Sequence, residues 1–294
     1  MPKRIFVSYS HSHQPWVKEA LVPCLQAAGV DVVVDFLHMQ VAQSVMGQMD
    51  SLQDGCDSSL LVLTPEYLVK PYCIHEMERA FARGAAIPVV RADCGDAMPA
   101  AARGILRADL RDDQIESQWN GLMDACGGHS GVSAVKWLRA RRETLLCFER
   151  EESVNLVVSP GNPGWLPLVE GVAKEHRPPM PVIDLDDGAA ASRRGLIGLI
   201  ARGWGVPGAV PRASDDLRFL SDALTHAPRA VALVHFERAE HRNYETDFFA
   251  ALRHGTGQRR LRLLVESRVP ILELVPRDHP LSSMNMTTVE LRGR

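Results

Sequence analysis

The chain has 294 residues, 46% of them hydrophobic and 23% charged, with a formal net charge of −3. This length is comfortable for two domains with full cores, and the near-neutral charge argues against general nucleic-acid binding. No apolar run approaches the roughly 18 residues of a membrane span, and no signal peptide is expected, because the N-terminal residues are predicted to lead directly into a strand.

Apolar strands alternate with segments of helical spacing in the first part of the chain. Residues 4–10 form an apolar run that closes in small polar residues, and residues 14–28 show helical spacing that Gly29 ends as a helix C-cap. Residues 30–35 are a second strand of the buried type. Further along, an apolar strand at 60–63 precedes a Thr-Pro turn. This alternation predicts βα units and a parallel sheet.

Glu76 is the most informative residue of this region. It opens a helical run at 74–82, just past the end of a parallel strand, where open α/β sheets place ligands. Tyr72, four residues earlier, can present its ring face to a flat heterocycle. We interpret this helix start as a candidate catalytic site. The alternative is a glutamate that only complements the helix dipole, which is worth roughly 0.3–1 kcal/mol.

Residues 3–126 resemble a TIR domain of the branch common in bacteria. The segment from Tyr72 to Glu76 stands where the family has Trp-x-x-x-Glu, and a closing helix is expected around Trp119 and Leu122. The other matching segments are residues 5–10, 33–44, 61–68, 86–90 and 108–111. The resemblance implies a flavodoxin-like α/β domain with a parallel five-stranded sheet over residues 1–128. A connecting helix or linker is expected over residues 129–150.

Many TIR domains cleave NAD+ at the nicotinamide–ribose bond. The resemblance therefore implies that Glu76 is the catalytic glutamate of a NAD+ glycohydrolase that becomes active on oligomerisation. NAD+ would be the substrate, with no cofactor and no metal. Loss of nicotinamide leaves positive charge on the ribose, and a nearby carboxylate stabilises that charge. The resemblance places the following residues around the substrate: Ser10, His11, Asp35, Ser44 and Tyr72.

Two departures from the family pattern keep a non-enzymatic TIR adaptor open as the alternative function. Tyr72 replaces the usual Trp, and the loop over residues 36–44 is apolar and lacks a glycine that many relatives carry. His11 has a second interpretation as one of three exposed polar residues. Cys73 adjoins the proposed pocket, but no His-Asp partners support a thiol nucleophile.

Residues 151–294 are predicted to form a second α/β domain, preceded by an amphipathic helix at 132–147. Strands are expected at residues 153–159, 180–185, 230–236, 261–267 and 289–291, and helices at residues 165–173, 190–204, 214–225 and 245–253. The strand, glycine loop and helix at its beginning resemble a P-loop module of the STAND type. A working P-loop reads G-x-x-x-x-G-K-[ST], but residues 159–166 supply neither the lysine nor the hydroxyl, and Glu237 is a weak substitute for the Asp-Glu pair. The resemblance implies a degenerate, regulatory or interaction domain; a generic α/β domain with a glycine turn is the alternative.

The two resemblances together predict a cytoplasmic TIR effector of bacterial antiphage defence. It would self-associate through its TIR domains and bind a protein partner through the second domain, while the missing lysine disfavours a nucleotide-operated switch. Arginine clusters at 139–142 and 259–262 are interpreted as solvated helix faces, with an acidic partner or RNA as the alternative. The six cysteines are scattered without a C-x-x-C pair, which indicates reduced thiols rather than disulfides or zinc.

Overall fold

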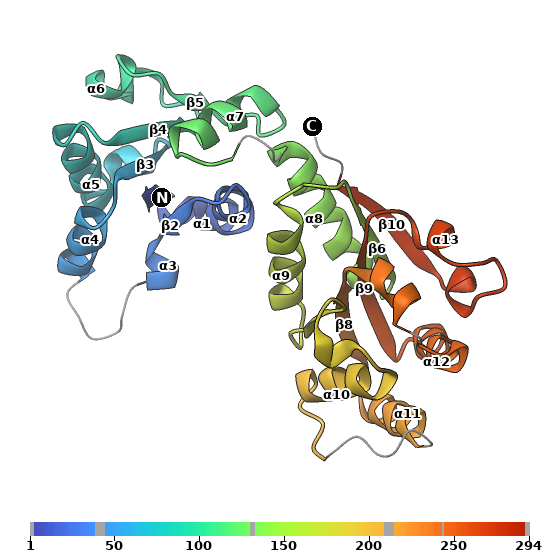
Figure 1. The fold of residues 1–294 in the computed structure, drawn as a ribbon. Helices are drawn as coiled ribbons and strands as arrows, with labels where there is room; N and C mark the ends of the chain where they lie inside the picture. Colours follow the sequence, from blue (N-terminus) through green and yellow to red (C-terminus); the bar gives the residue numbers. More distant parts are fainter. Residues whose placement is uncertain (1–2, 39–44, 130–132, 209–214, 243, 292–294) are drawn as a thin grey trace. The chain divides into compact units, whose positions relative to one another are not determined.

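The computed structural model describes residues 3–38, 45–129, 133–208, 215–242 and 244–291 (Figure 1). The chain divides into two compact units, residues 1–138 and 139–293. Each unit is built around one five-stranded sheet in which all strand pairs are parallel. Among the described residues, none of the helices combines the length and the apolar character that crossing a bilayer requires.

The sheet of the first unit has the strand order β2-β1-β3-β4-β5. Its strands are β1 (Arg4–Ser8), β2 (Asp31–Val33), β3 (Ser58–Leu63), β4 (Ala86–Val90) and β5 (Ala108–Asp109). Strand β1 lies inside the sheet, with Ile5 beside Val32 on one side and Ser58 on the other. Interior parallel strands are covered on both faces, which explains why β1 and β3 are almost wholly buried and mostly apolar. The predicted flavodoxin-like order is confirmed.

The first predicted helix is also confirmed. Three consecutive segments, α1 (Gln14–Trp16), η2 (Val17–Leu21) and α2 (Val22–Ala27), together cover it. The middle segment has the wider π-type turn, which fits the position of Pro23 as the second residue of α2, because proline has no backbone N–H to donate. Gly29 ends the run with a φ of +80°, the left-handed conformation typical of a C-cap glycine.

Two predictions for the region between the second and third strands need correction. The loop predicted over residues 36–44 is wrong at its start, because helix α3 (Asp35–His38) occupies residues 35–38; residues 39–44 lie outside the described residues. Helix α4 (Val45–Asp54) follows and has no counterpart in the sequence prediction.

The prediction that Glu76 opens a helix is wrong. Helix α5 (Pro71–Ala82) begins five residues earlier, with Lys70 in the extended conformation before it. Proline is favoured at the first helical position, where its missing N–H costs nothing, so Pro71 marks the true start. Glu76 therefore lies in the second turn of the helix, and a favourable interaction with the helix N-terminus does not explain its presence.

The remaining helices of the first unit are shorter, apart from the one that closes the sheet. The predicted closing helix is confirmed as α7 (Glu116–Ala125), whose Trp119 is completely buried. The others are η1 (His11–His13), η3 (Tyr67–Val69), η4 (Gly95–Ala97) and α6 (Ala100–Arg103). The helix predicted at 132–147 is observed as α8 (Ala134–Glu149).

The second unit is a second parallel α/β structure with the strand order β10-β6-β9-β8-β7. Its strands are β6 (Ser153–Val158), β7 (Val182–Asp184), β8 (Arg229–Val234), β9 (Leu261–Ser267) and β10 (Met286–Leu291). Its helical segments are α9 (Trp165–Glu175), η5 (Gly188–Ala190), α10 (Arg193–Gly203), α11 (Asp216–His226), η6 (Phe236–His241), α12 (Thr246–Gly257), α13 (Ile271–Leu274) and η7 (Pro280–Ser283).

All the strands predicted for this unit are present, so its α/β class is confirmed. Strand β9 has the predicted bounds, β7 is shorter than predicted and β10 is longer. The first strand, β6, lies inside the sheet between β10 and β9, and its loop leads into α9. This is the strand–loop–helix order from which a P-loop is built.

Candidate active site at the carboxyl edge of the first sheet

A cavity of about 610 Å³ lies at the carboxyl ends of the strands of the first sheet. In an open sheet of this order, the chain departs in opposite directions after β1 and β3, which leaves a crevice where ligands bind. The volume falls within the range of small-molecule sites. The lining residues are Phe6, Val7, Tyr9, Ser10, His11, Ser12, Asp35, Met49, Glu66, Lys70, Pro71, Tyr72, Cys73 and Glu76.

Five of the six site residues predicted from the sequence line this one cavity. They come from three places: the segment after β1 (Ser10, His11), the start of α3 (Asp35) and the first two turns of α5 (Tyr72, Glu76). Ser44, the sixth, lies outside the described residues. The roles of all six stay predictions.

Glu76 is held from several sides and is only 2% exposed. Its Oε2 accepts a hydrogen bond of 2.5 Å from Ser8 Oγ, and Ser8 Oγ lies 2.7 Å from the Tyr67 hydroxyl. Gln53 donates through Nε2 to the main-chain carbonyl of Glu76 at 2.8 Å. The other carboxylate oxygen, Oε1, is buried and has no hydrogen-bond partner among the described residues. A buried carboxylate oxygen without a donor is costly, so it marks a place where a ligand can contribute one.

The surroundings of Glu76 disfavour its charged form. Burial raises the pKa of this carboxyl group to about 7, and the nearby charges of Asp35 and Asp50 act in the same direction. The hydrogen bond from Ser8 and the charge of His75 act in the opposite direction but do not compensate fully. Perturbed carboxyl groups in a cleft are typical of functional sites.

Asp35 ties the segment after β1 to the start of α3. The Tyr9 hydroxyl donates to Asp35 Oδ1 at 2.6 Å, and His11 Nε2 lies 3.1 Å from Oδ2. Burial and the adjacent Asp35 raise the pKa of Tyr9, so its hydroxyl stays protonated and donates. The His11 side chain is 78% exposed, so it borders the cavity from the solvent side.

The rim of the cavity carries an aromatic ring and a cationic side chain. Tyr72 is half exposed, and Lys70 is an exposed residue directly before α5. Sequence reasoning missed Lys70 as a lining residue, and it missed Ser8 and Tyr67 as partners of Glu76. Lys70 could have been found from Pro71, because a proline at the first helical position shows where the helix begins and therefore which residue precedes it.

Cys73 lines the same cavity but is unsuited to nucleophilic attack. Its thiol is buried, its Sγ lies 3.5 Å from the carbonyl oxygen of Tyr9, and burial raises its pKa to about 12. The thiolate is the reactive form of cysteine, so the neutral thiol of Cys73 packs as a small apolar group.

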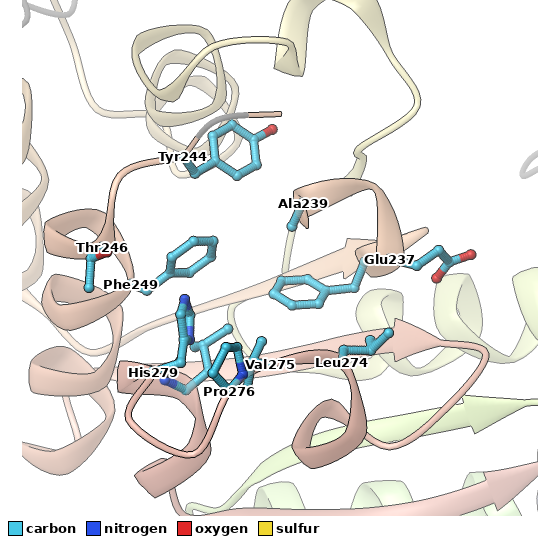
Figure 2. A pocket seen from close by; sticks show the side chains of 11 residues that line it. Glu237, Ala239, Tyr244, Thr246, Phe249, Leu274, Val275, Pro276 and His279 are labelled. Carbon is cyan, nitrogen blue, oxygen red and sulfur yellow. Dashed lines mark hydrogen bonds between the residues drawn. The ribbon is translucent and has the colours of Figure 1, made fainter. Parts of the chain in front are cut away.

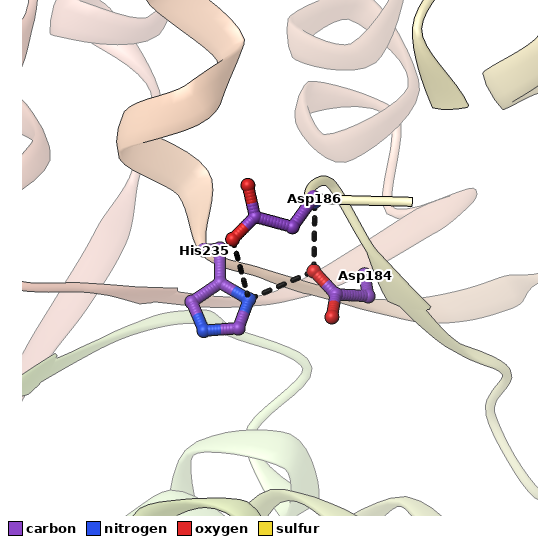
Figure 3. Close-up of side chains that lie close together, drawn as sticks. All are labelled: Asp184, Asp186 and His235. Atoms are coloured by element: carbon purple, nitrogen blue, oxygen red, sulfur yellow. Dashed lines mark hydrogen bonds and ion pairs between the residues drawn. The ribbon is translucent and has the colours of Figure 1, made fainter. Parts of the chain in front are cut away.

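The second unit gathers charged groups at the carboxyl edge of its own sheet. His235 follows β8, and Figure 3 shows its ring facing Asp184 and Asp186. Its Nδ1 lies 2.8 Å from Asp184 Oδ1 and 3.9 Å from Asp186 Oδ2. Arg238 Nε also pairs with Asp186 at 2.7 Å. Partial burial lowers the pKa of His235, but its hydrogen bond to Asp184 and the charge of that carboxylate raise it more, so the net shift is upward. Two carboxylates thus face one imidazole ring and one guanidinium group.

A separate cavity of about 300 Å³ in the second unit has aromatic walls (Figure 2). Phe236, Tyr244, Phe249 and His279 line it, and the rings of Phe249 and His279 are 4.8 Å apart. His279 Nδ1 accepts a hydrogen bond from the Leu281 main-chain N–H. The cavity is mostly apolar, and its contacts single out no ligand.

The first unit is a TIR domain. The family model described as TIR domain matches residues 5–123, the part of the chain that holds the first sheet and the Glu76 cavity. TIR domains commonly self-associate, and the family includes members that hydrolyse NAD+.

Two solved structures match parts of the chain at low sequence identity. The TIR domain of the Toll-related receptor TRR-2 from Hydra magnipapillata is 16% identical, and the match covers 42% of this chain and 98% of that chain with a TM-score of 0.39. A chain of the Drosophila ORC bound to DNA is 12% identical, and the match covers 53% of this chain and 90% of that chain with a TM-score of 0.39. Identities and scores this low say nothing of what the present chain binds. No curated protein matches the sequence.

Proposed function

We propose that the TIR domain hydrolyses NAD+ at the nicotinamide–ribose bond, with Glu76 as the catalytic residue. The observation that carries the proposal is a buried carboxylate with one unpartnered oxygen, bordering a cavity of about 610 Å³ at the β1/β3 crevice. The raised pKa of Glu76 adds support, since such shifts gather at functional sites.

The proposed reaction needs little from the protein beyond charge and orientation. When the glycosidic C–N bond breaks, its electron pair stays on the nicotinamide ring, which departs neutral. Positive charge develops on the ribose, and the ionised Glu76 stabilises it. Water then adds to the sugar carbon and releases a proton. Tyr72 at the rim is suited to stack on a flat ring, and Lys70 is suited to face a phosphate.

The resting conformation fits an enzyme that needs activation. Glu76 borders the cavity yet is 2% exposed, so a substrate reaches its oxygens only after the surrounding side chains move. Assembly of several TIR domains is the proposed trigger, and Leu37 and Met46, on either side of residues 39–44 in the sequence, are exposed apolar residues available for that contact. An antiphage role, with the second unit recruiting a protein partner, completes the proposal. The second unit is proposed as a P-loop-type fold without its phosphate site.

The decisive experiment compares matched glutamates of one helix. The purified full chain, concentrated to favour assembly, is incubated with NAD+, and released nicotinamide is measured by chromatography. Glu76→Gln should lose at least roughly a hundredfold in rate, whereas Glu78→Gln, which changes an exposed residue of α5, should retain it. Wild-type turnover in Glu76→Gln would refute the mechanism.

Dilution tests the activation step. Specific activity should rise with protein concentration, and Leu37→Asp should abolish that rise by placing a charge on the contact surface. High activity in a monomer, measured by light scattering at the assay concentration, would contradict activation by assembly. If an assembled wild-type protein consumes no NAD+, the adaptor function becomes the better explanation. Two departures from the family pattern, Tyr72 in place of Trp and the apolar segment after Asp35, would then agree with it.

A further inference from the structure

Ser8, Tyr67 and Glu76 form a chain of hydrogen bonds beneath the cavity. The three side chains come from β1, η3 and α5, and each is at most 2% exposed. The Oγ of Ser8 lies between the other two groups, 2.5 Å from Glu76 Oε2 and 2.7 Å from the Tyr67 hydroxyl. Neither Ser8 nor Tyr67 lines the cavity, so both act on a substrate only through Glu76.

The number of protons available determines which group donates in each of these hydrogen bonds. A serine hydroxyl has one proton to donate. When Glu76 is ionised, the Ser8 proton must point to Oε2, and the Ser8 oxygen is then free to accept the proton of Tyr67. When Glu76 is protonated, the chain can run the other way, from Glu76 through Ser8 to Tyr67. Burial raises the pKa of Tyr67 well above its usual value, so its hydroxyl keeps its proton in both arrangements.

We infer that Ser8 and Tyr67 are positioning residues for Glu76, which hold its Oε2 and leave Oε1 as the oxygen that meets the substrate. The inference rests on the proposed function for its catalytic meaning. The hydrogen bond itself orients the carboxylate, because it fixes one oxygen at the base of α5 while the other has no partner among the described residues.

The same bond favours the ionised form of the carboxylate. Hydrogen bonds to a charged acceptor are stronger than those to a neutral one, and the Ser8 bond lowers the pKa of Glu76 against the opposing effect of burial. Removing the Ser8 hydroxyl should therefore raise the midpoint of Glu76 ionisation. Other titratable groups around Glu76 are Tyr9 and His11 after β1, Asp35 in α3, Asp50 in α4, Glu66 and Lys70 between β3 and α5, and Cys73 and His75 in α5. Ser8→Ala and Tyr67→Phe leave all of these unchanged.

The test titrates Glu76 directly and does not depend on turnover. The ionisation of Glu76 in the full chain is followed by ¹³C NMR of labelled glutamate, with the Glu76→Gln spectrum used for assignment. Ser8→Ala should shift the midpoint upward by roughly one pH unit, Tyr67→Phe by less, and Ser8→Thr should restore it. Ser59→Ala is the matched control, because Ser59 is a buried serine of the adjacent strand whose hydroxyl bonds Gln53 and not Glu76.

The rate of NAD+ cleavage against pH supplies the second measurement. If Glu76 acts as its carboxylate, the acidic limb of the Ser8→Ala profile should move upward by the same amount, so that the loss at pH 7 is largely recovered at pH 9. A merely structural serine would lower the rate equally at all pH values. If Ser8→Ala does not fold, Tyr67→Phe, which removes a single oxygen, takes its place.

The outcomes separate the inference from the proposed function. An ionisation midpoint that does not move in Ser8→Ala or Tyr67→Phe overturns the positioning role, whatever the activity. A midpoint that moves as expected, in a protein whose assembled wild type cleaves no NAD+, supports the positioning role and refutes the function.

Discussion

Gln53 of α4 donates a hydrogen bond of 2.8 Å to the main-chain carbonyl of Glu76 in α5. The Gln53 side chain is completely buried, and its amide also contacts Ser59 at 3.1 Å and Arg79 at 3.2 Å. One amide thus joins β3 and α5 to α4 at the turn that carries the candidate catalytic carboxylate. The position of Glu76 therefore depends on a contact from helix α4.

Replacing this amide by an apolar group of similar size should weaken the first unit. Gln53→Leu removes the hydrogen bonds that Gln53 makes with the Ser59 hydroxyl and with Arg79. We therefore expect a loss of about 1–3 kcal/mol in the free energy of unfolding. Urea denaturation of the full chain measures it. Gln26→Leu, at an exposed position of α2, is the control and should change stability by less than about 0.5 kcal/mol. An equal effect of both substitutions would contradict a specific role for Gln53.

Glu76 should make the folded protein less stable as the pH rises. Its pKa is raised from 4.5 to about 7 on folding, so between these values the folded state keeps a proton that the unfolded state has released. Stability must then fall with increasing pH across that window. Glu76→Gln cannot titrate, so its stability relative to the wild type should increase from pH 4.5 to pH 8 by on the order of 3 kcal/mol. Thermal unfolding at several pH values tests this, and a gain that is independent of pH would contradict it.

Much of the fold follows from local sequence patterns. Strand β9 has its predicted bounds because a short segment rich in leucine and valine is typical of a buried parallel strand. Gly29 follows the end of α2 because it adopts a left-handed φ of +80°, which glycine alone accommodates readily. The five-stranded sheet of the TIR domain follows from the order of such segments and from the family resemblance.

The parts that could not be predicted depend on contacts distant in the sequence. Ser8 and Glu76 are 68 residues apart, and no spacing rule relates them. Helix α4 packs its polar Gln53 inward, which is contrary to the usual sign of a buried position. The start of α5, by contrast, could have been predicted from the sequence, because Pro71 is typical of a first helical position. The prediction relied instead on the apolar spacing that begins at Ile74.

Cys73 should be dispensable for catalysis. Its buried thiol has a pKa of about 12, so almost none of it is the reactive thiolate at neutral pH. Cys73→Ala should keep NAD+ cleavage within about threefold of the wild type, at a cost in stability of about 1–2 kcal/mol for the lost apolar contacts. The measurement is the rate of NAD+ cleavage by Cys73→Ala and Glu76→Gln in the same assay. A loss in Cys73→Ala as large as that in Glu76→Gln would make the thiol, and not the carboxylate, the reacting group.

The ion pair between His235 and Asp184 should stabilise the second unit mainly at low pH. The pKa of His235 is raised in the folded state, so its contribution is fully present below the unfolded value and is lost as the pH rises through the folded one. His235→Gln should therefore destabilise more at pH 5.5 than at pH 9, by roughly 0.2–1 kcal/mol, because the pair is partly exposed. His254→Gln, an exposed residue of α12, is the control. A larger loss at pH 9 would show that the imidazole acts as a neutral group.

The second unit should not hydrolyse ATP, although its first strand, loop and helix have the order of a P-loop. Several phosphate charges must be neutralised together, by backbone amides and by a lysine. Pro160 and Pro163 remove two amide donors from the loop, and Trp165, where the lysine would stand, lies with its ring against His235 at a centroid distance of 5.2 Å. We expect no heat of binding when the full chain is titrated with ATP and magnesium up to about 1 mM, and no phosphate release above that of buffer. Magnesium-dependent turnover that disappears in Glu237→Gln would refute this prediction and restore a nucleotide-operated switch.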